Sequence, residues 1–236
     1  MSMECKVQIG IIGAMKVEIE GINEMMENKE TLTLSGISFV RGDLFGKKIV
    51  TAVCGIGKVF AAMCAQTMIL GFSPEIIINS GVAGSLCEEL SIGDVVIGEK
   101  LVQHDIDTTA LGDEKGLISG INKVYIETDE KISAVLKKCV ESMGINSHSG
   151  TIASGDSFIN DCEKKKELAQ TFGAVACEME GGAMAQVCYI NKIPFSVMRA
   201  ISDGGDDNSH LDYNEFLKMA SLRSVEVMKK FVEIYE

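Results

Sequence analysis

Near its start the chain reads VQIGIIGA over residues 7–14, a near-continuous apolar run that is punctuated by glycine. Such a run is typical of a strand that is buried on both faces of a parallel sheet. Along the rest of the chain, short β-branched runs alternate with longer segments of helical period. This alternation predicts an α/β fold: a single domain over residues 1–236, with a mixed, mostly parallel twisted sheet and helices on both faces.

The patterns place the remaining elements between short connections. Strands are predicted at residues 37–44, 48–54, 75–79, 94–103, 149–154, 174–179 and 194–201. Helices are predicted at residues 18–27, 57–70, 129–143, 163–172, 182–189 and 212–235. The helix at 163–172 is rich in lysine and is interpreted as a surface helix. Residues 80–84 are interpreted as a turn of small residues, and residues 105–125 as a polar loop.

Composition and charge limit the possible partners. The net charge of −12 argues against binding to nucleic acid or to an anionic membrane surface, but a pocket can still hold a small molecule. No apolar run approaches the ~20 residues of a membrane span, and no leader pattern is visible. We therefore expect a cytoplasmic protein without nucleic-acid or membrane partners.

Cysteine and histidine usage bears on cofactors. The 8 cysteines form no C-x-x-C pair, and several fall inside apolar strand or helix patterns, which favours reduced thiols in the core. The 3 histidines are widely spaced, so we expect no metal site, and the chemistry proposed below requires no cofactor.

Three carboxylates follow three separate predicted strands: Glu18, Glu180 and Asp203. In open α/β sheets the ligand lies beyond the carboxyl ends of the strands, so these side chains could share one crevice. Cleavage of an N-glycosidic bond needs carboxylates near a sugar that develops positive charge, a proton for the departing purine and a base for water. An aromatic residue such as Phe158 could stack on a purine.

Each of these residues also has an ordinary structural interpretation. Glu18 could interact favourably with a helix dipole, Asp203 could be an N-cap, and Glu180 could face water. The Gly181-Gly182 pair at a helix start suggests close approach of a ligand or neighbouring backbone. The GIGK sequence at residues 55–58 lacks the remaining residues of the dinucleotide and P-loop motifs, so its amides are only a generic anion or hydroxyl site.

Five strings, in this order and spacing, carry a family resemblance over essentially the whole chain. They are GIIGAM at 10–15 followed by Glu18, GIGK at 55–58, SGDSFI at 154–159, EME at 178–180 and RAISD at 199–203. Together they resemble the bacterial 5'-methylthioadenosine/S-adenosylhomocysteine nucleosidases, which have the nucleoside phosphorylase fold. The resemblance implies hydrolysis of these thioethers to adenine and a 5-thioribose product, as part of methionine salvage.

The resemblance also implies roles for individual residues. Glu18 would activate the hydrolytic water, and Asp203 would address N7 and the exocyclic amine of adenine. The substrate-binding residues it implies are Glu180 and Met179 at the ribose, Phe158 and Ile159 at adenine, Met15, Ile56 and Tyr213 around the ribose and 5' pocket, Glu178 in the same motif, and Arg199 behind the site. Whether Asp203 carries its proton before substrate binds stays open. A homodimer is implied, with the loop at 105–120 near the partner's site.

Two departures from the family pattern stand out. Val82 takes the place of a common serine and cannot hydrogen-bond through its side chain; Leu111 and Ser119 replace bulkier aromatic and proline residues in the 5'-pocket loop. Related phosphorylases bind phosphate with a side-chain hydroxyl at the turn that corresponds to residues 80–84. Val82 has no hydroxyl, and this argues against phosphorolysis. The alternatives are a purine nucleoside phosphorylase, a nucleosidase for another purine nucleoside such as futalosine, and a non-catalytic nucleoside-binding protein.

Overall fold

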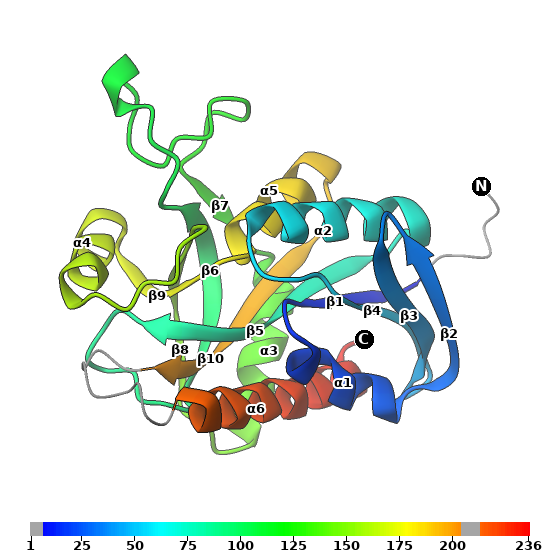
Figure 1. Ribbon diagram of the computed structural model, residues 1–236. Helices are drawn as coiled ribbons and strands as arrows, with labels where there is room; N and C mark the ends of the chain where they lie inside the picture. Colours follow the sequence, from blue (N-terminus) through cyan, green and yellow to red (C-terminus); the bar gives the residue numbers. More distant parts are fainter. Residues whose placement is uncertain (1–6, 204–212) are drawn as a thin grey trace.

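The first predicted strand lies inside the sheet, as its apolar sequence indicates. In a computed structural model of the chain, which describes residues 7–203 and 213–236, β1 (Ile9–Gly13) pairs in parallel with β4 (Lys47–Val53) and β5 (Ile76–Ser85) (Figure 1). All five residues of β1 are buried. The apolar run of the sequence is therefore a strand covered on both faces, which confirms the prediction.

The other strands extend the sheet on both sides of β1. They are β2 (Glu27–Leu34), β3 (Ile37–Leu44), β6 (Val95–Gln103), β7 (Tyr125–Glu127), β8 (Ser147–Ser154), β9 (Ala174–Glu178) and β10 (Phe195–Asp203). The strand order is β10-β6-β8-β9-β5-β1-β4-β3-β2, with β7 paired to β6, and β10 also pairs with β5. This last pairing closes β5, β10, β6, β8 and β9 into a ring, from which β1, β4, β3 and β2 continue as an open sheet.

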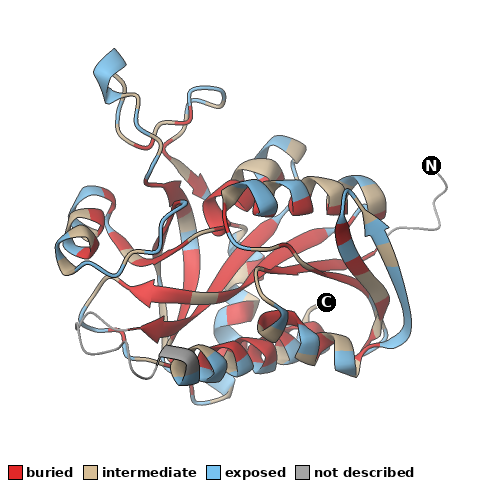
Figure 2. Ribbon diagram, in the orientation of Figure 1, coloured by how far each residue is buried: buried red, intermediate tan, exposed pale blue. Residues whose placement is uncertain are grey.

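Helices cover both faces, as predicted. They are α1 (Lys16–Met25), α2 (Lys58–Phe72), α3 (Glu130–Ser142), α4 (Cys162–Phe172), α5 (Gly181–Asn191) and α6 (Tyr213–Ile234). Residues of α2 and α5 form one apolar cluster with the sheet, and residues of α1, α3 and α6 form another. Figure 2 shows the buried strands between these helices, whose outer faces are exposed. Cys64, Cys139 and Cys188 are fully buried free thiols in these clusters.

Two sequence predictions need correction. Residues 80–84 are not a turn, because β5 continues through them and pairs with β10 on one side and, at its end, with β9 on the other. β2 was missed because it is an exposed edge strand with little apolar alternation, and β7 because it has only 3 residues. Antiparallel pairings join β10 to β6, β5 to β9, β7 to β6 and β2 to β3 to β4, beside the parallel pairings, so the sheet is mixed, as predicted.

The polar segment between β6 and β7 is a loop, as predicted. It contains a single 3₁₀ turn (Thr109–Leu111) and one isolated bridge between Ile118 and Lys123. Figure 1 shows this loop reaching away from the sheet and its helices. Within the described ranges, no helix combines the length and apolar character needed to cross a bilayer.

Candidate active site

A cavity of about 120 Å³ opens at the carboxyl ends of β1, β9 and β10. It is lined by residues from widely separated parts of the chain, which are Ala14, Met15, Glu18, Ile56, Val82, Ala83, Gly84, Phe158, Cys177, Glu178, Met179, Glu180, Ser202 and Asp203. Small-molecule sites mix apolar walls with a few polar groups in the same way. The three carboxylates predicted from the strand ends therefore share one cavity.

Glu18 lies on the first turn of α1 with its side chain bent back over the helix start. Its Oε2 accepts hydrogen bonds from the backbone N–H groups of Ala14 (2.7 Å) and Met15 (2.9 Å). Its Oε1 accepts one from the N–H of Val82 on β5, at 3.2 Å. Burial raises the pKa of Glu18 above its ordinary value of 4.5, although these N–H groups and the charge of Arg199 favour the ionised form. The residue is a buried carboxylate held in one orientation, not a surface cap.

Two glycines of β5 make room for two carboxylates. A Cβ at Gly81 would lie 2.7 Å from Glu18 Oε1, and one at Gly84 would lie 2.8 Å from Asp203 Oδ2. Both distances are too short for a normal contact. The small residues that suggest a turn therefore belong to a strand, and two of its glycines leave room for Glu18 and Asp203.

Replacing Gly81 by alanine is expected to lower kcat about 10-fold or more, because the methyl group must push the Glu18 carboxylate from its position and a small misplacement of a reacting group is costly. Ser38→Ala is the control, since Ser38 is exposed on β3, away from the residues that line the cavity. Steady-state kinetics on both variants measure the difference. Equal activity of the two variants would show that the position of Glu18 does not limit turnover.

Glu178 and Arg199 form a fully buried ion pair beneath the cavity. The carboxylate of Glu178 also accepts hydrogen bonds from the Ser154 hydroxyl and from the N–H groups of Glu180 (3.0 Å) and Gly181 (2.7 Å). Although burial favours its neutral form, Arg199 and these donors hold the pKa of Glu178 below its ordinary value. Arg199 also donates to the backbone oxygen of Asn79 at 3.1 Å. It lies behind the site and does not line the cavity.

Glu180 stands just before α5 and faces the cavity. Its Oε1 accepts a hydrogen bond from the N–H of Gly57 at 2.8 Å, and the neighbouring N–H of Lys58 donates to Asp156 at 2.7 Å. The amides at the start of α2, which the sequence left as a generic anion site, are thus occupied by the protein's own carboxylates. Burial and the charge of Glu178 raise the pKa of Glu180 to about 7. Near neutral pH such a carboxyl group can donate or accept hydrogen bonds with sugar hydroxyls.

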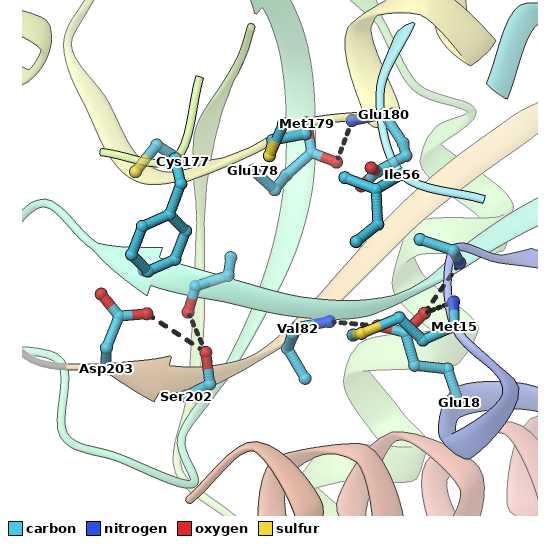
Figure 3. Close-up of a pocket in the computed structure, with 14 residues that line it drawn as sticks. Met15, Glu18, Ile56, Val82, Cys177, Glu178, Met179, Glu180, Ser202 and Asp203 are labelled. Carbon is cyan, nitrogen blue, oxygen red and sulfur yellow. Dashed lines mark hydrogen bonds between the residues drawn. The ribbon is translucent and has the colours of Figure 1, made fainter. Parts of the chain in front are cut away.

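Asp203 ends β10 on the opposite side of the cavity from Glu18 (Figure 3). Its Oδ1 accepts a hydrogen bond from the Ser202 hydroxyl at 3.1 Å. Its Oδ2 lies 3.1 Å from the ammonium nitrogen of Lys165, and both side chains are buried. Lys165 is a residue that the sequence interpretation missed, because it belongs to the lysine-rich helix α4 that was expected to lie on the surface. Its spacing from the apolar Leu168 and Phe172 could have indicated the buried face.

The remaining predicted residues fall into three groups. Met15, Ile56, Met179 and Phe158 line the main cavity, where Ile56 and Phe158 are both 56% exposed. Ile159 lines a small adjoining cavity beside Asp203. Tyr213 begins α6, but its side chain lies outside the described residues.

Two glycines and one valine can now be explained. The Gly181-Gly182 pair leaves room for neighbouring side chains of the protein itself. A Cβ at Gly182 would lie 2.9 Å from the side chain of Gln103 and 3.0 Å from that of Ser154. Val82 contributes its backbone N–H to Glu18, so this contact does not depend on a side-chain hydroxyl. In the described part of the chain, no group of three or more His, Cys, Asp or Glu residues is arranged to hold a metal ion.

The fold and the cavity place the chain in a known class of proteins: the family model of the phosphorylase superfamily matches residues 8–233. Among curated relatives, a 5'-methylthioadenosine/S-adenosylhomocysteine nucleosidase of Shewanella halifaxensis is 41% identical over 220 residues, which cover 92% of this chain and 95% of the relative. The chain therefore belongs, within the phosphorylase superfamily, to the family of 5'-methylthioadenosine/S-adenosylhomocysteine nucleosidases.

Solved structures agree with this assignment. The nucleosidase of Neisseria meningitidis in complex with methylthio-immucillin-A has a TM-score of 0.91 and 36% identity, covering 96% of this chain and 98% of its own. The futalosine hydrolase of Helicobacter pylori has a TM-score of 0.92 and also 36% identity, covering 98% and 99% of the two chains. Both the sequence resemblance and the predicted fold class are confirmed.

Proposed function

We propose that this protein hydrolyses the N-glycosidic bond of 5'-methylthioadenosine and S-adenosylhomocysteine and releases adenine and the corresponding 5-thioribose. One observation carries the proposal: Asp203 and Glu18, both buried, lie on opposite sides of a single cavity, with Glu180 and Met179 along its wall (Figure 3). A nucleoside that spans this cavity would present its purine to Asp203 and its sugar to Glu18.

The residues divide the reaction between them. Asp203 donates a proton to N7 of adenine, and the electron pair of the breaking C1'–N9 bond passes into the purine. Glu18 takes a proton from the water molecule that adds to C1', and its negative charge stabilises the positive charge that develops on the sugar. Glu180 binds the ribose hydroxyls, Met179 packs on the sugar, and Phe158 stacks on adenine beside Ile159. Met15, Ile56 and Tyr213 border the ribose and the 5' substituent.

The cavity supports water over phosphate as the attacking group. Among the described residues that line it, none is lysine or arginine, and the buried Arg199 is engaged by Glu178 and Asn79. Glu18, a buried carboxylate, would repel a phosphate ion. Val82 offers no hydroxyl at the β5 position where a phosphate could bind.

The test is adenine release from the two thioethers in phosphate-free buffer and again with phosphate added. We expect the same rate in both buffers and a free thioribose product. A requirement for phosphate would remove Glu18 from its role as the water base and favour the phosphorylase alternative. No turnover of any purine nucleoside would favour the binding-protein alternative.

Futalosine is the second candidate substrate, because a futalosine hydrolase is among the similar structures. The two reactions share the same bond and differ in the purine and in the 5' substituent. Competition between futalosine and 5'-methylthioadenosine in one assay gives the ratio of their kcat/KM values directly. We expect the thioether to be preferred, in accordance with the curated relatives.

We further propose that the protein acts as a homodimer in the cytoplasm. The outer faces of α2 and α5 expose a group of large apolar side chains, which are Val59, Phe60, Met63, Leu70, Tyr189 and Ile190. We call this group the α2–α5 outer face. The loop that contains Leu111, itself 82% exposed, reaches away from the body of its own subunit (Figure 1). A second copy on this face would bury the apolar group, and the loop could then close the partner's 5' pocket.

Light scattering after size exclusion tests the dimer. We expect twice the mass of one chain for the wild type and a monomer for Val59→Lys, because Val59 is 69% exposed on the α2–α5 outer face and a buried, unpaired lysine would be costly. Ser142→Lys introduces the same charge on α3, on the other face of the sheet, and should stay dimeric. A monomeric wild type would contradict the proposal.

A further inference from the structure

Helix α4 carries three consecutive lysines, and one of them is buried. Lys164 is paired with Glu167 at 2.8 Å, and Lys166 is exposed. Lys165 has only 7% of its surface exposed and lies on the same face as Leu168 and Phe172, which pack in the core. The helical repeat thus turns one lysine of the three toward the protein interior.

The burial of Lys165 requires a physical reason. An ammonium group loses a large hydration energy on burial unless an opposite charge compensates for it. Its Nζ lies 3.1 Å from Oδ2 of Asp203, which is also buried. The ion pair joins a residue of α4 to the end of β10, and its acidic member lines the cavity.

We propose that Lys165 is a positioning residue for Asp203: it holds Oδ2 in place, leaves Oδ1 to face the purine, and keeps a positive charge beside the acid. The proposal rests on the function proposed above. An ammonium group at this distance stabilises a carboxylate over the neutral acid. After proton transfer to N7, Lys165 then stabilises the carboxylate that is left behind.

Among the residues that the structure describes, the other groups around Asp203 are neutral or paired elsewhere. From β9, Cys177 faces both Asp203 and Lys165, and its thiol is neutral because burial raises its pKa to about 12. From β10, Ser202 donates a hydroxyl hydrogen bond. From β5, Gly84 contributes only backbone. Glu178, which follows Cys177, is paired with Arg199. In the described part of the chain, Lys165 is thus the cation that contacts Asp203.

The pH dependence of kcat/KM for adenine release distinguishes the effect of the charge of Lys165 from the effect of its size and shape. Lys165→Met keeps much of the volume, Lys165→Gln keeps a hydrogen-bond donor without charge, and Lys165→Arg keeps the charge. The alkaline limb of the profile should move to higher pH by about 1–3 units in the Met and Gln variants, because an adjacent cation no longer favours the ionised acid. It should stay within about 0.5 unit of the wild type in Lys165→Arg and in the exposed control Lys166→Met.

If the alkaline limb of the kcat/KM profile is not shifted in a folded Lys165→Met or Lys165→Gln protein, the proposal is wrong. Circular dichroism and melting curves establish which variants are folded. If the Met variant does not fold, the Gln variant decides the question. A second substrate excludes a merely structural effect: a 4-nitrophenyl 5-methylthioriboside releases a phenolate that needs no proton. Its turnover should change less than 3-fold in a folded Lys165→Met protein, whereas an equal loss on both substrates would contradict the proposal.

Failure of the proposed function can be recognised separately. If the wild type releases no adenine from either thioether, the proposed activity is wrong whatever the variants do. The affinity for free adenine, measured by calorimetry across the same pH range, then tests Lys165 without turnover. The pH at which adenine affinity declines should rise in Lys165→Met and not in Lys166→Met; an identical pH dependence in the two variants overturns the role of Lys165.

Discussion

Replacing Asp203 by asparagine is expected to lower kcat for adenine release by about 10²–10⁴-fold, while KM changes much less. Asparagine keeps the size of the side chain and can still hydrogen-bond to adenine, but it has no carboxyl proton to give to N7. The loss therefore falls on the transition state, in which the purine departs with its new proton, more than on substrate binding. Steady-state kinetics with 5'-methylthioadenosine measure both parameters.

The matched control for this variant is Asp129→Asn. Asp129 is the N-cap of α3, where its side chain accepts hydrogen bonds from the N–H groups of Lys131 and Ile132, and asparagine caps helices about as well as aspartate. Its turnover should equal that of the wild type. Turnover of Asp203→Asn within a few-fold of the wild type would remove Asp203 from the role of proton donor.

Glu18→Gln is expected to reduce kcat by about 10²–10⁴-fold, because the amide can neither accept a proton from water nor stabilise positive charge on the sugar. The pH dependence of the wild type carries a second expectation. Glu18 acts as a base only when ionised, and burial raises its pKa above 4.5. Activity should therefore be lost, as pH falls, through a pKa that lies above that of an ordinary glutamate. A kcat/KM profile gives the position of this limb.

Glu20→Gln is the control for Glu18→Gln, because Glu20 is exposed two residues further along the same helix. It should leave both the rate and the acidic limb unchanged. If Glu18→Gln kept the wild-type rate, Glu18 could not be the water base. An acidic limb at or below 4.5 would contradict the raised pKa of Glu18.

Much of the fold could be predicted from local patterns. The apolar run at residues 7–14 contains the buried strand β1 (Ile9–Gly13), and the alternation of strands and helices gives the α/β class. Both could be predicted because burial on one or both faces determines the period of apolar residues in the sequence. The edge strand β2 could not be predicted in this way, because most of its residues are exposed and show no alternation of apolar and polar side chains. The extension of β5 through residues 80–84 was also hidden, since glycine and small residues favour turns when no neighbouring strand is known.

The candidate site could be predicted residue by residue but not as an arrangement. Glu18, Glu180 and Asp203 each follow a predicted strand, so the sequence by itself indicated that they could meet, and it indicated which chemistry three carboxylates can perform. It could not show that β10 pairs with β5, that Gly81 and Gly84 lie directly against two of these carboxylates, or that Lys165 reaches Asp203. Those contacts join segments that are tens of residues apart in the chain, and they depend on strand register and helix rotation. Such quantities are decided only when the whole core packs, whereas the type of each element and the residue at its end are set by the local sequence.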